Sequence, residues 1–141
     1  MTALVVDASV WVSAADAADR LSTPSRTFLR AAMRRRDPIA LPASARLEVA
    51  CALARRLRDA GRGRELADGL LHSPPITEMD LGSLLGTALT MGTESFLRAG
   101  DAFYAAVATD VDGIIISWDE ELLRRANALT PSAWLSGHGE D

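Results

Sequence analysis

Two acidic residues stand where a buried strand ends, which is an expensive place for a negative charge. Asp7 comes directly after the apolar run 4–6, and Asp119 comes three positions after the apolar run 114–116. A carboxylate in such a position is costly unless something cationic neutralises it. Two of them in one small domain predict a pocket for a divalent cation. Mg²⁺ or Mn²⁺ bound to carboxylates is typical of chemistry on phosphates.

Two further acids lie in segments with helical spacing, among small apolar residues. Glu48 has small apolar residues at its +3 and +4 positions, which favours a place against a groove or the core. An ion pair with Arg46 or Arg55 is the alternative for Glu48. Asp101 begins an alanine-rich stretch that is able to pack tightly on a sheet, although an acid at a helix start also acts as an ordinary cap.

Simpler explanations exist for the strand-end acids as well. Asp7 is also suited to a turn or a helix N-cap, and Ser9 to capping the helix that follows. Asp119 precedes two other acids that suit a solvated helix start, but it is the nearest of the three to the strand. Other chemistries fit poorly, because the sequence has no zinc-like spacing of His and Cys and no phosphate-binding glycine loop.

Composition narrows the class of protein. The chain has 141 residues, of which 48% are hydrophobic, and this suits a single domain over residues 1–135 with a frayed tail at 136–141. The single Cys51 excludes an internal disulfide and makes the cytoplasm the expected compartment. We expect no signal peptide and no membrane span, since no apolar run approaches the ~20 residues that a span needs.

Charge is distributed unevenly between the two halves of the chain. The net charge is −4, the chain has no Lys, and arginines are concentrated in residues 1–64. Two clusters stand out, Arg34–Arg36 and the group Arg55, Arg56 and Arg58. Arginine suits bidentate contact with phosphate oxygens, so these clusters are candidates for holding nucleic acid beside the acidic pocket. The alternative is that they lie on solvated helix faces.

Strand-like and helix-like segments alternate along the chain. Apolar runs predict strands at 1–6, 39–42, 76–79 and 114–117, and apolar periodicity predicts helices at 10–18, 25–36, 44–58, 65–71, 81–91, 101–111 and 120–129. Gly61 and Gly63 are expected to end the third helix. This order predicts an α/β fold, a three-layer α/β/α sandwich around a mostly parallel sheet of four to five strands. Sites in such folds lie at the carboxyl ends of the strands.

The acidic residues occur in four short segments that resemble, in order and spacing, a known family. The segments are 5–10 (VVDASV), 47–49 (LEV), 101–108 (DAFYAAVA) and 117–119 (SWD). Together they resemble the PIN domain, and the order, spacing and length are similar to the VapC-type toxins of bacterial toxin–antitoxin pairs. The resemblance covers residues 3–135. The region 126–134 is shorter than usual in the family, which leaves a fifth strand open, and Trp118 is an unusual neighbour of the site.

The resemblance implies a metal-dependent endoribonuclease, a hydrolase of RNA phosphodiester bonds that uses Mg²⁺ or Mn²⁺. Its acids would be Asp7, Glu48, Asp101 and Asp119, with Ser9 and Ser117 in support. It also implies a homodimer and a cognate VapB-like antitoxin. Cleavage by metal-activated water would leave 5′-phosphate and 3′-hydroxyl ends. A catalytically silent PIN-like binding module, or a metal-dependent phosphatase or phospho-receiver domain, remains as an alternative.

Overall fold

A sheet of four parallel strands lies at the centre of the fold, in the order β3-β2-β1-β4. In the computed structural model, which describes residues 2–73 and 75–138, the strands are β1 (Leu4–Val6), β2 (Ile39–Pro42), β3 (Ile76–Met79) and β4 (Ile114–Ile116). The predicted strands are therefore confirmed, and all four run in the same direction. β1 and β2 are buried along their whole length, as expected of parallel strands covered on both faces.

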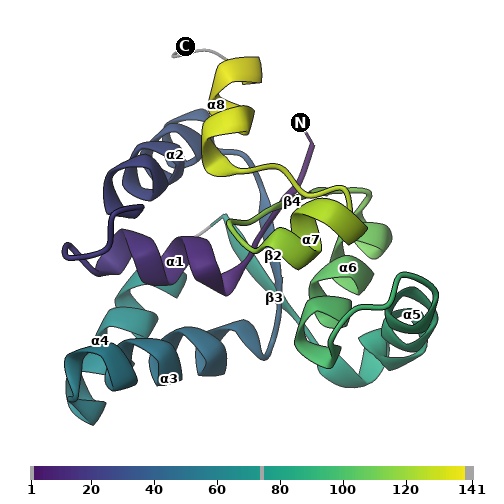
Figure 1. The fold of residues 1–141 in the computed structure, drawn as a ribbon, viewed down its shortest axis with the longest axis horizontal. Helices are drawn as coiled ribbons and strands as arrows, with labels where there is room; N and C mark the ends of the chain where they lie inside the picture. Colours follow the sequence, from purple (N-terminus) through teal and green to yellow (C-terminus); the bar gives the residue numbers. More distant parts are fainter. Residues whose placement is uncertain (1, 74, 139–141) are drawn as a thin grey trace.

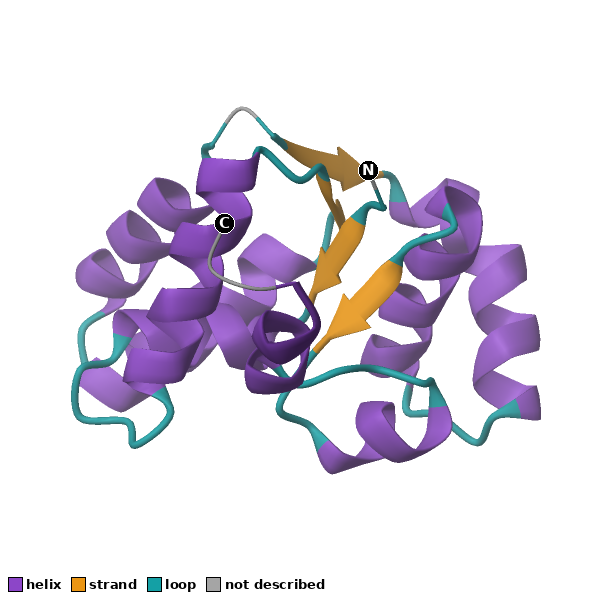
Figure 2. Cartoon of the chain, turned by 90° about the horizontal axis from the view of Figure 1, so that it is seen from above, coloured by secondary structure: helices purple, strands orange, loops and turns teal. Residues whose placement is uncertain are grey.

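Helices cover both faces of the sheet, which confirms the three-layer α/β/α architecture (Figure 1). The helices α1 to α4 and α8 gather on one side of the strands, and α5 and α6 lie on the other (Figures 1 and 2). Their bounds are α1 Ala8–Ala15, α2 Ser22–Arg35, α3 Ala45–Leu57, α4 Ala60–Leu71, α5 Leu81–Glu94, α6 Ala99–Val111, α7 Glu120–Arg125 and α8 Pro131–His138.

The register of the two central strands fixes where their end residues lie. β1 pairs with β4 so that Val6 is opposite Ile116. The residues that follow, Asp7 and Ser117, therefore leave the sheet side by side at its carboxyl edge. Asp7 also donates its backbone N–H to the carbonyl of Ile116, with an N···O distance of 2.9 Å.

The loop after α3 differs from the sequence-based expectation. Gly61 and Gly63 do not form a break, because Asp59 caps a new helix by accepting a hydrogen bond from the backbone N–H of Arg62, and α4 begins at Ala60. Gly63 has a packing role instead. A Cβ at Gly63 would lie 2.8 Å from the carbonyl oxygen of Ala50, so the missing side chain lets α4 lie directly against α3.

The C-terminal region holds the second difference. The last predicted helix, 120–129, is really the short α7, and the chain then pairs once with β4 through an isolated bridge between Leu129 and Ile116. A further helix, α8, follows and continues to His138, so a frayed tail from residue 136 was the wrong expectation for residues 136–138. Residues 139–141 lie outside the described residues. The bridge is all that the described part of the chain shows of a fifth strand.

Helix α8 covers α2. The fully buried Trp134 meets the ring of Phe28 edge-to-face, with ring centroids 5.2 Å apart. Phe28 and Leu29 on α2 are both buried. Within the described residues, no helix is both long and apolar enough to cross a membrane.

Candidate active site

The carboxyl edge of β1 and β4 carries a connected chain of hydrogen bonds. Asp7 is 6% exposed and caps α1, and its Oδ2 accepts hydrogen bonds from the hydroxyl of Ser117 at 2.8 Å and from the backbone N–H of Ser9 at 3.3 Å. The same Ser117 hydroxyl oxygen accepts the backbone N–H of Asp119 at 2.9 Å. One buried serine therefore holds both strand-end acids in place.

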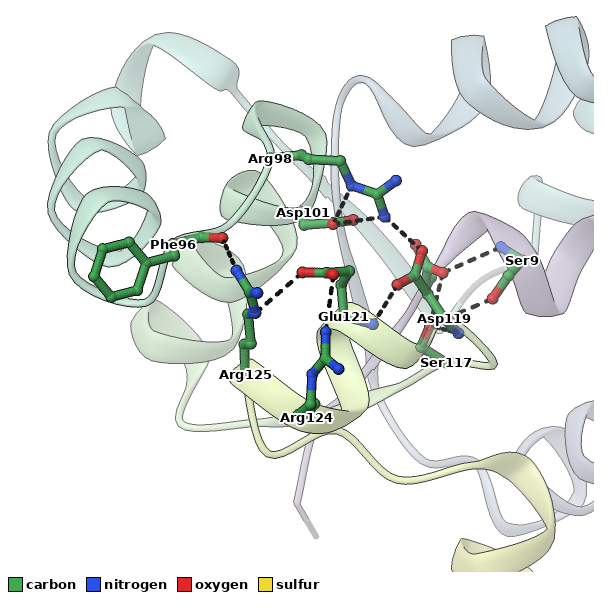
Figure 3. Close-up of polar contacts among 10 residues, drawn as sticks. Ser9, Phe96, Arg98, Asp101, Ser117, Asp119, Glu121, Arg124 and Arg125 are labelled. Carbon is green, nitrogen blue, oxygen red and sulfur yellow. Dashed lines mark hydrogen bonds and ion pairs between the residues drawn. The ribbon is translucent and has the colours of Figure 1, made fainter.

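Asp119 and Asp101 are brought together by an arginine. Asp119 caps α7, its Oδ1 accepting the backbone N–H of Glu121 at 2.7 Å. Its Oδ2 lies 2.7 Å from Nη2 of Arg98, and the same Nη2 lies 3.1 Å from Oδ2 of Asp101 (Figure 3). Arg98 is the N-cap residue of α6, and Asp101 lies in the first turn of that helix. Asp119, in the loop after β4, and Asp101, on α6, therefore share one guanidinium group.

Glu48 approaches from the first turn of α3 without a cation of its own. Its Oε1 atom is buried and has no hydrogen-bond partner within the described residues, and the same is true of the hydroxyl of Tyr104 on α6. Burial, followed by the negative charge of Asp7, raises the pKa of Glu48 to about 7. Burial and the charge of Glu48 likewise raise the pKa of Tyr104, so its hydroxyl stays neutral.

The pKa values of Asp7 and Asp101 are raised as well. Burial raises the pKa of Asp7, against the hydrogen bonds from Ser9 and Ser117, and the charge of Asp119 adds to the rise. Burial also raises the pKa of Asp101, although Arg98 opposes it, and Asp119 and Asp7 both contribute. Asp7 follows β1 and Asp119 lies in the loop after β4, and Glu48 and Asp101 lie in the first turns of α3 and α6. All four predicted acids therefore lie at the carboxyl edge of the sheet.

Some of the site residues also have the structural roles that their sequence positions allowed. Asp7 and Asp119 are helix N-caps as well as members of the acidic cluster, so each has a structural role in addition to its place in the candidate site. Ser9 lies inside α1 and is not its cap. Glu48 does not pair with Arg46, which binds Asp68 at 2.8 Å and Glu78 at 2.9 Å instead.

Trp118 is tied to the helical layer. Its indole N–H donates to the hydroxyl of Ser25 on α2 at 2.8 Å, and its backbone N–H donates to the hydroxyl of Ser9 at 3.1 Å. These two hydrogen bonds hold Trp118 against α1 and α2. The second also gives Ser9 a role in fixing the loop between β4 and α7.

The arginine beside the cluster is not one of those that the sequence singled out. Arg34–Arg36 end α2 just before β2 begins, so they lie at the opposite, amino edge of the sheet and not beside the acids. Arg56 is paired with Asp16 at 3.0 Å and Asp19 at 2.6 Å, which ties α3 to the loop after α1. Sequence reasoning missed Arg98, although its place one helical turn before Asp101 was a usable signal.

The cluster suits a hard divalent cation by its donor atoms. In residues 2–73 and 75–138, no three Asp, Glu, His or Cys side chains are positioned to bind one metal ion together. The observation that argues for a cation is the buried Oε1 of Glu48, near the buried carboxyl of Asp7. This oxygen makes no well-formed hydrogen bond, although the hydroxyls of Tyr104 and Ser44 lie close to Glu48. The site offers only oxygen ligands, which Mg²⁺ and Mn²⁺ prefer. The residues present therefore fit such an ion, provided that Arg98 moves.

The raised pKa of Glu48 makes a prediction about the stability of the metal-free chain. The pKa is about 7 in the folded chain against an ordinary 4.5, so between these values the folded state binds more protons than the unfolded state. The free energy of unfolding should therefore fall as the pH rises through this window. Glu48→Gln removes that loss and should be more stable than the parent at pH 8 by about 1–2 kcal/mol, with little difference at pH 4.5.

The measurement is urea denaturation in EDTA across this pH range. Glu94→Gln, which removes an exposed carboxylate at the end of α5, is the matched control and should follow the parent. If the parent and Glu48→Gln differ by the same amount at pH 4.5 and pH 8, the account of Glu48 is wrong.

The chain is similar to known proteins in both sequence and structure. The sequence matches the PIN domain family over residues 4–128, and no curated protein sequence matches the chain. Protein PAE2754 from Pyrobaculum aerophilum has a similar structure, with a TM-score of 0.68 and 20% identity over 96% of this chain and 88% of that one. A toxin–antitoxin complex from Klebsiella pneumoniae is also similar, with a TM-score of 0.65 and 14% identity over 91% of this chain and 97% of that one. The family match spans most of the chain, which therefore belongs to the PIN domain family.

Proposed function

We propose that the chain is a VapC-type toxin, an endoribonuclease that depends on Mg²⁺ or Mn²⁺ and is neutralised by a cognate VapB-like antitoxin. The observation that carries the proposal is the cluster of four carboxyls at the carboxyl edge of a PIN-family sheet. Membership of this family supports a nuclease. The printed description of the Klebsiella neighbour, a toxin–antitoxin complex, supports an antitoxin partner.

Asp7, Asp101 and Asp119, with Glu48, would hold the ion, because they are the carboxyls that gather at this edge. When bound, a divalent cation would activate water as the nucleophile and stabilise charge on the phosphate. The chain's own residues prepare the place for it. Ser117 orients Asp7 by donating to its Oδ2, and it fixes Asp119 by accepting its backbone N–H.

Glu48 contributes through its proton. With a pKa of about 7, its carboxyl is protonated in much of the metal-free chain at neutral pH. A cation held by Asp7 would favour the ionised form, so Glu48 would release its proton as the ion binds. Tyr104, packed beside it and neutral, would then be a hydrogen-bond donor within reach of the site.

The antitoxin needs a surface, and the groove between α2 and α4 offers one. This groove has a volume of about 960 Å³ and apolar walls that include Trp11, Leu29, Met33 and Leu70. Three arginines, Arg30, Arg34 and Arg36, also line it. An antitoxin segment that carries both apolar and acidic side chains would complement this groove.

A homodimer would need a different surface, and the helical layer of α5 and α6 carries one. Leu85, Leu89 and Phe96 are 58%, 69% and 77% exposed, and they line a single cavity at the junction of α5 and α6. Exposed apolar side chains that gather in this way are typical of interfaces between proteins. We therefore assign the proposed dimer contact to α5 and the loop after it, and the antitoxin to α2 and α4.

Cleavage should depend on the charge of Asp7 more than on its shape. Asp7→Asn keeps the volume and an acceptor oxygen for Ser117, but it removes one negative ligand. We expect RNA cleavage to fall by at least about a hundredfold and Mn²⁺ affinity to fall with it, while the metal-free fold becomes modestly more stable because one repelling charge is gone.

The assay is cleavage of structured RNA by the purified chain in Mg²⁺ or Mn²⁺, with analysis of the product ends for 5′-phosphate. Asp110→Asn, an exposed Asp near the end of α6, is the matched control and should cleave like the parent. Equal cleavage by Asp7→Asn and the parent would refute the metal-dependent mechanism. No cleavage by the parent with either metal would favour the silent binding module.

The antitoxin should protect the groove and not the dimer surface. When the protein encoded beside the toxin is added, backbone amide exchange should slow in α2 and α4, because their side chains line the groove. Exchange in α5 should stay as it was in the toxin alone. Hydrogen exchange followed by mass spectrometry resolves these helices. Protection confined to α5, with none at residues 22–35 or 60–71, would contradict the placement.

A further inference from the structure

Arg98 occupies a position between two of the acids that the proposed function assigns to the ion. Its Nε and Nη2 both lie 3.1 Å from Oδ2 of Asp101, and Nη2 also lies 2.7 Å from Oδ2 of Asp119 (Figure 3). The guanidinium group therefore neutralises acids that come from two different elements, α6 and the loop after β4. Arg98 is therefore the counterion of Asp101 and Asp119 within the chain.

Arg98 holds the oxygen of Asp119 that is not used by the helix cap. The other oxygen, Oδ1, accepts the backbone N–H of Glu121 at 2.7 Å and keeps α7 capped. Oδ2 is bound only by the side chain of Arg98, at 2.7 Å. A divalent cation at Oδ2 would lie against the positive charge of the guanidinium, so the two would repel each other there.

Arg98 is free to leave, since most of its side chain is in solvent. The side chain is 66% exposed, whereas those of Asp101 and Asp119 are only 13% and 28% exposed. The fold encloses the two acids, whereas little of it packs against the arginine. Because a guanidinium keeps its charge at any ordinary pH, it is removed by displacement and not by deprotonation.

We propose that Arg98 competes with the divalent cation for Asp101 and Asp119, so that the ion must displace its guanidinium from Asp119 in order to bind. This inference rests on the proposed metal site. Arg98 then has two effects of opposite sign. It stabilises the metal-free fold by neutralising the acids, and it weakens the affinity for the cation.

The test is Mn²⁺ binding by the purified chain, measured by calorimetry, together with the melting temperature in EDTA and in Mn²⁺. Arg98→Gln keeps a polar side chain and removes the charge. We expect it to bind Mn²⁺ on the order of threefold to tenfold more tightly than the parent. It should also melt at a lower temperature than the parent in EDTA, and gain more from added Mn²⁺.

Arg124→Gln is the matched control. Arg124 is 64% exposed and forms the same kind of i,i+3 ion pair, with Glu121, but touches neither Asp101 nor Asp119. It should leave Mn²⁺ affinity unchanged. Arg98→Lys retains a positive charge and should stay close to the parent in affinity, which guards against a folding defect of Arg98→Gln.

The possible outcomes separate the two claims. If the parent binds Mn²⁺ and Arg98→Gln binds it equally or more weakly, the competition is refuted and the metal site stands. If neither the parent nor Arg98→Gln binds Mn²⁺, the metal site and the competition are both refuted. Tighter binding by Arg98→Gln with unchanged affinity in Arg124→Gln and Arg98→Lys supports the competition.

Discussion

The electrostatic cost of gathering carboxylates at one end of a buried parallel sheet governs this molecule. Asp7 is almost fully buried, and the charges of its neighbours add to the cost of ionising it. Transfer of a carboxylate out of water is tolerated only where hydrogen bonds or a cation compensate it. The chain supplies three partial remedies, namely hydrogen bonds from Ser9 and Ser117, the guanidinium of Arg98, and a proton on Glu48. A divalent cation would replace the last two.

The fold makes this concentration of charge unavoidable. β1 lies between β2 and β4, so Asp7 stands at the middle of the sheet, and the register of β1 with β4 puts Ser117 beside it. The α3 helix brings Glu48 because its first turn follows β2 directly. The α6 helix packs on β1, β2 and β4, and its first turn carries Asp101. A scaffold that is covered on both faces thus places Asp7, Glu48, Asp101 and Asp119 at one edge of the sheet.

Much of the fold and the acidic cluster could be predicted from local patterns. The four strands were recognisable as apolar runs, and the two strand-end acids followed from them. Glu48 was recognisable because its helical neighbours are small and apolar. What the patterns could not supply was long-range packing. Gly63 looked like a helix breaker, but close contact with Ala50 of α3 explains it. Helix α8 is short and weakly periodic, and its cover over Phe28 became visible only in three dimensions.

The same limit applies to the arginines. Arg34–Arg36 stand out in the sequence because they are three consecutive arginines. They lie at the end of α2, just before β2 begins, and therefore at the amino edge of the sheet. Arg98 is a single cation in an acidic half of the sequence. Its importance comes from contact with Asp119, which is 21 positions away. Its pairing with Asp101 was readable from their spacing, but the contact with Asp119 depends on the tertiary fold.

The central claim is that the four gathered carboxyls, and no other group, form the cation site. The most direct measurement is an anomalous difference map from crystals of the chain grown with Mn²⁺. The account predicts a manganese peak bounded by Asp7, Glu48, Asp101 and Asp119, with the guanidinium of Arg98 turned away from Asp119. A peak at another place alone, or a map without one while Arg98 still bridges Asp101 and Asp119, would contradict it.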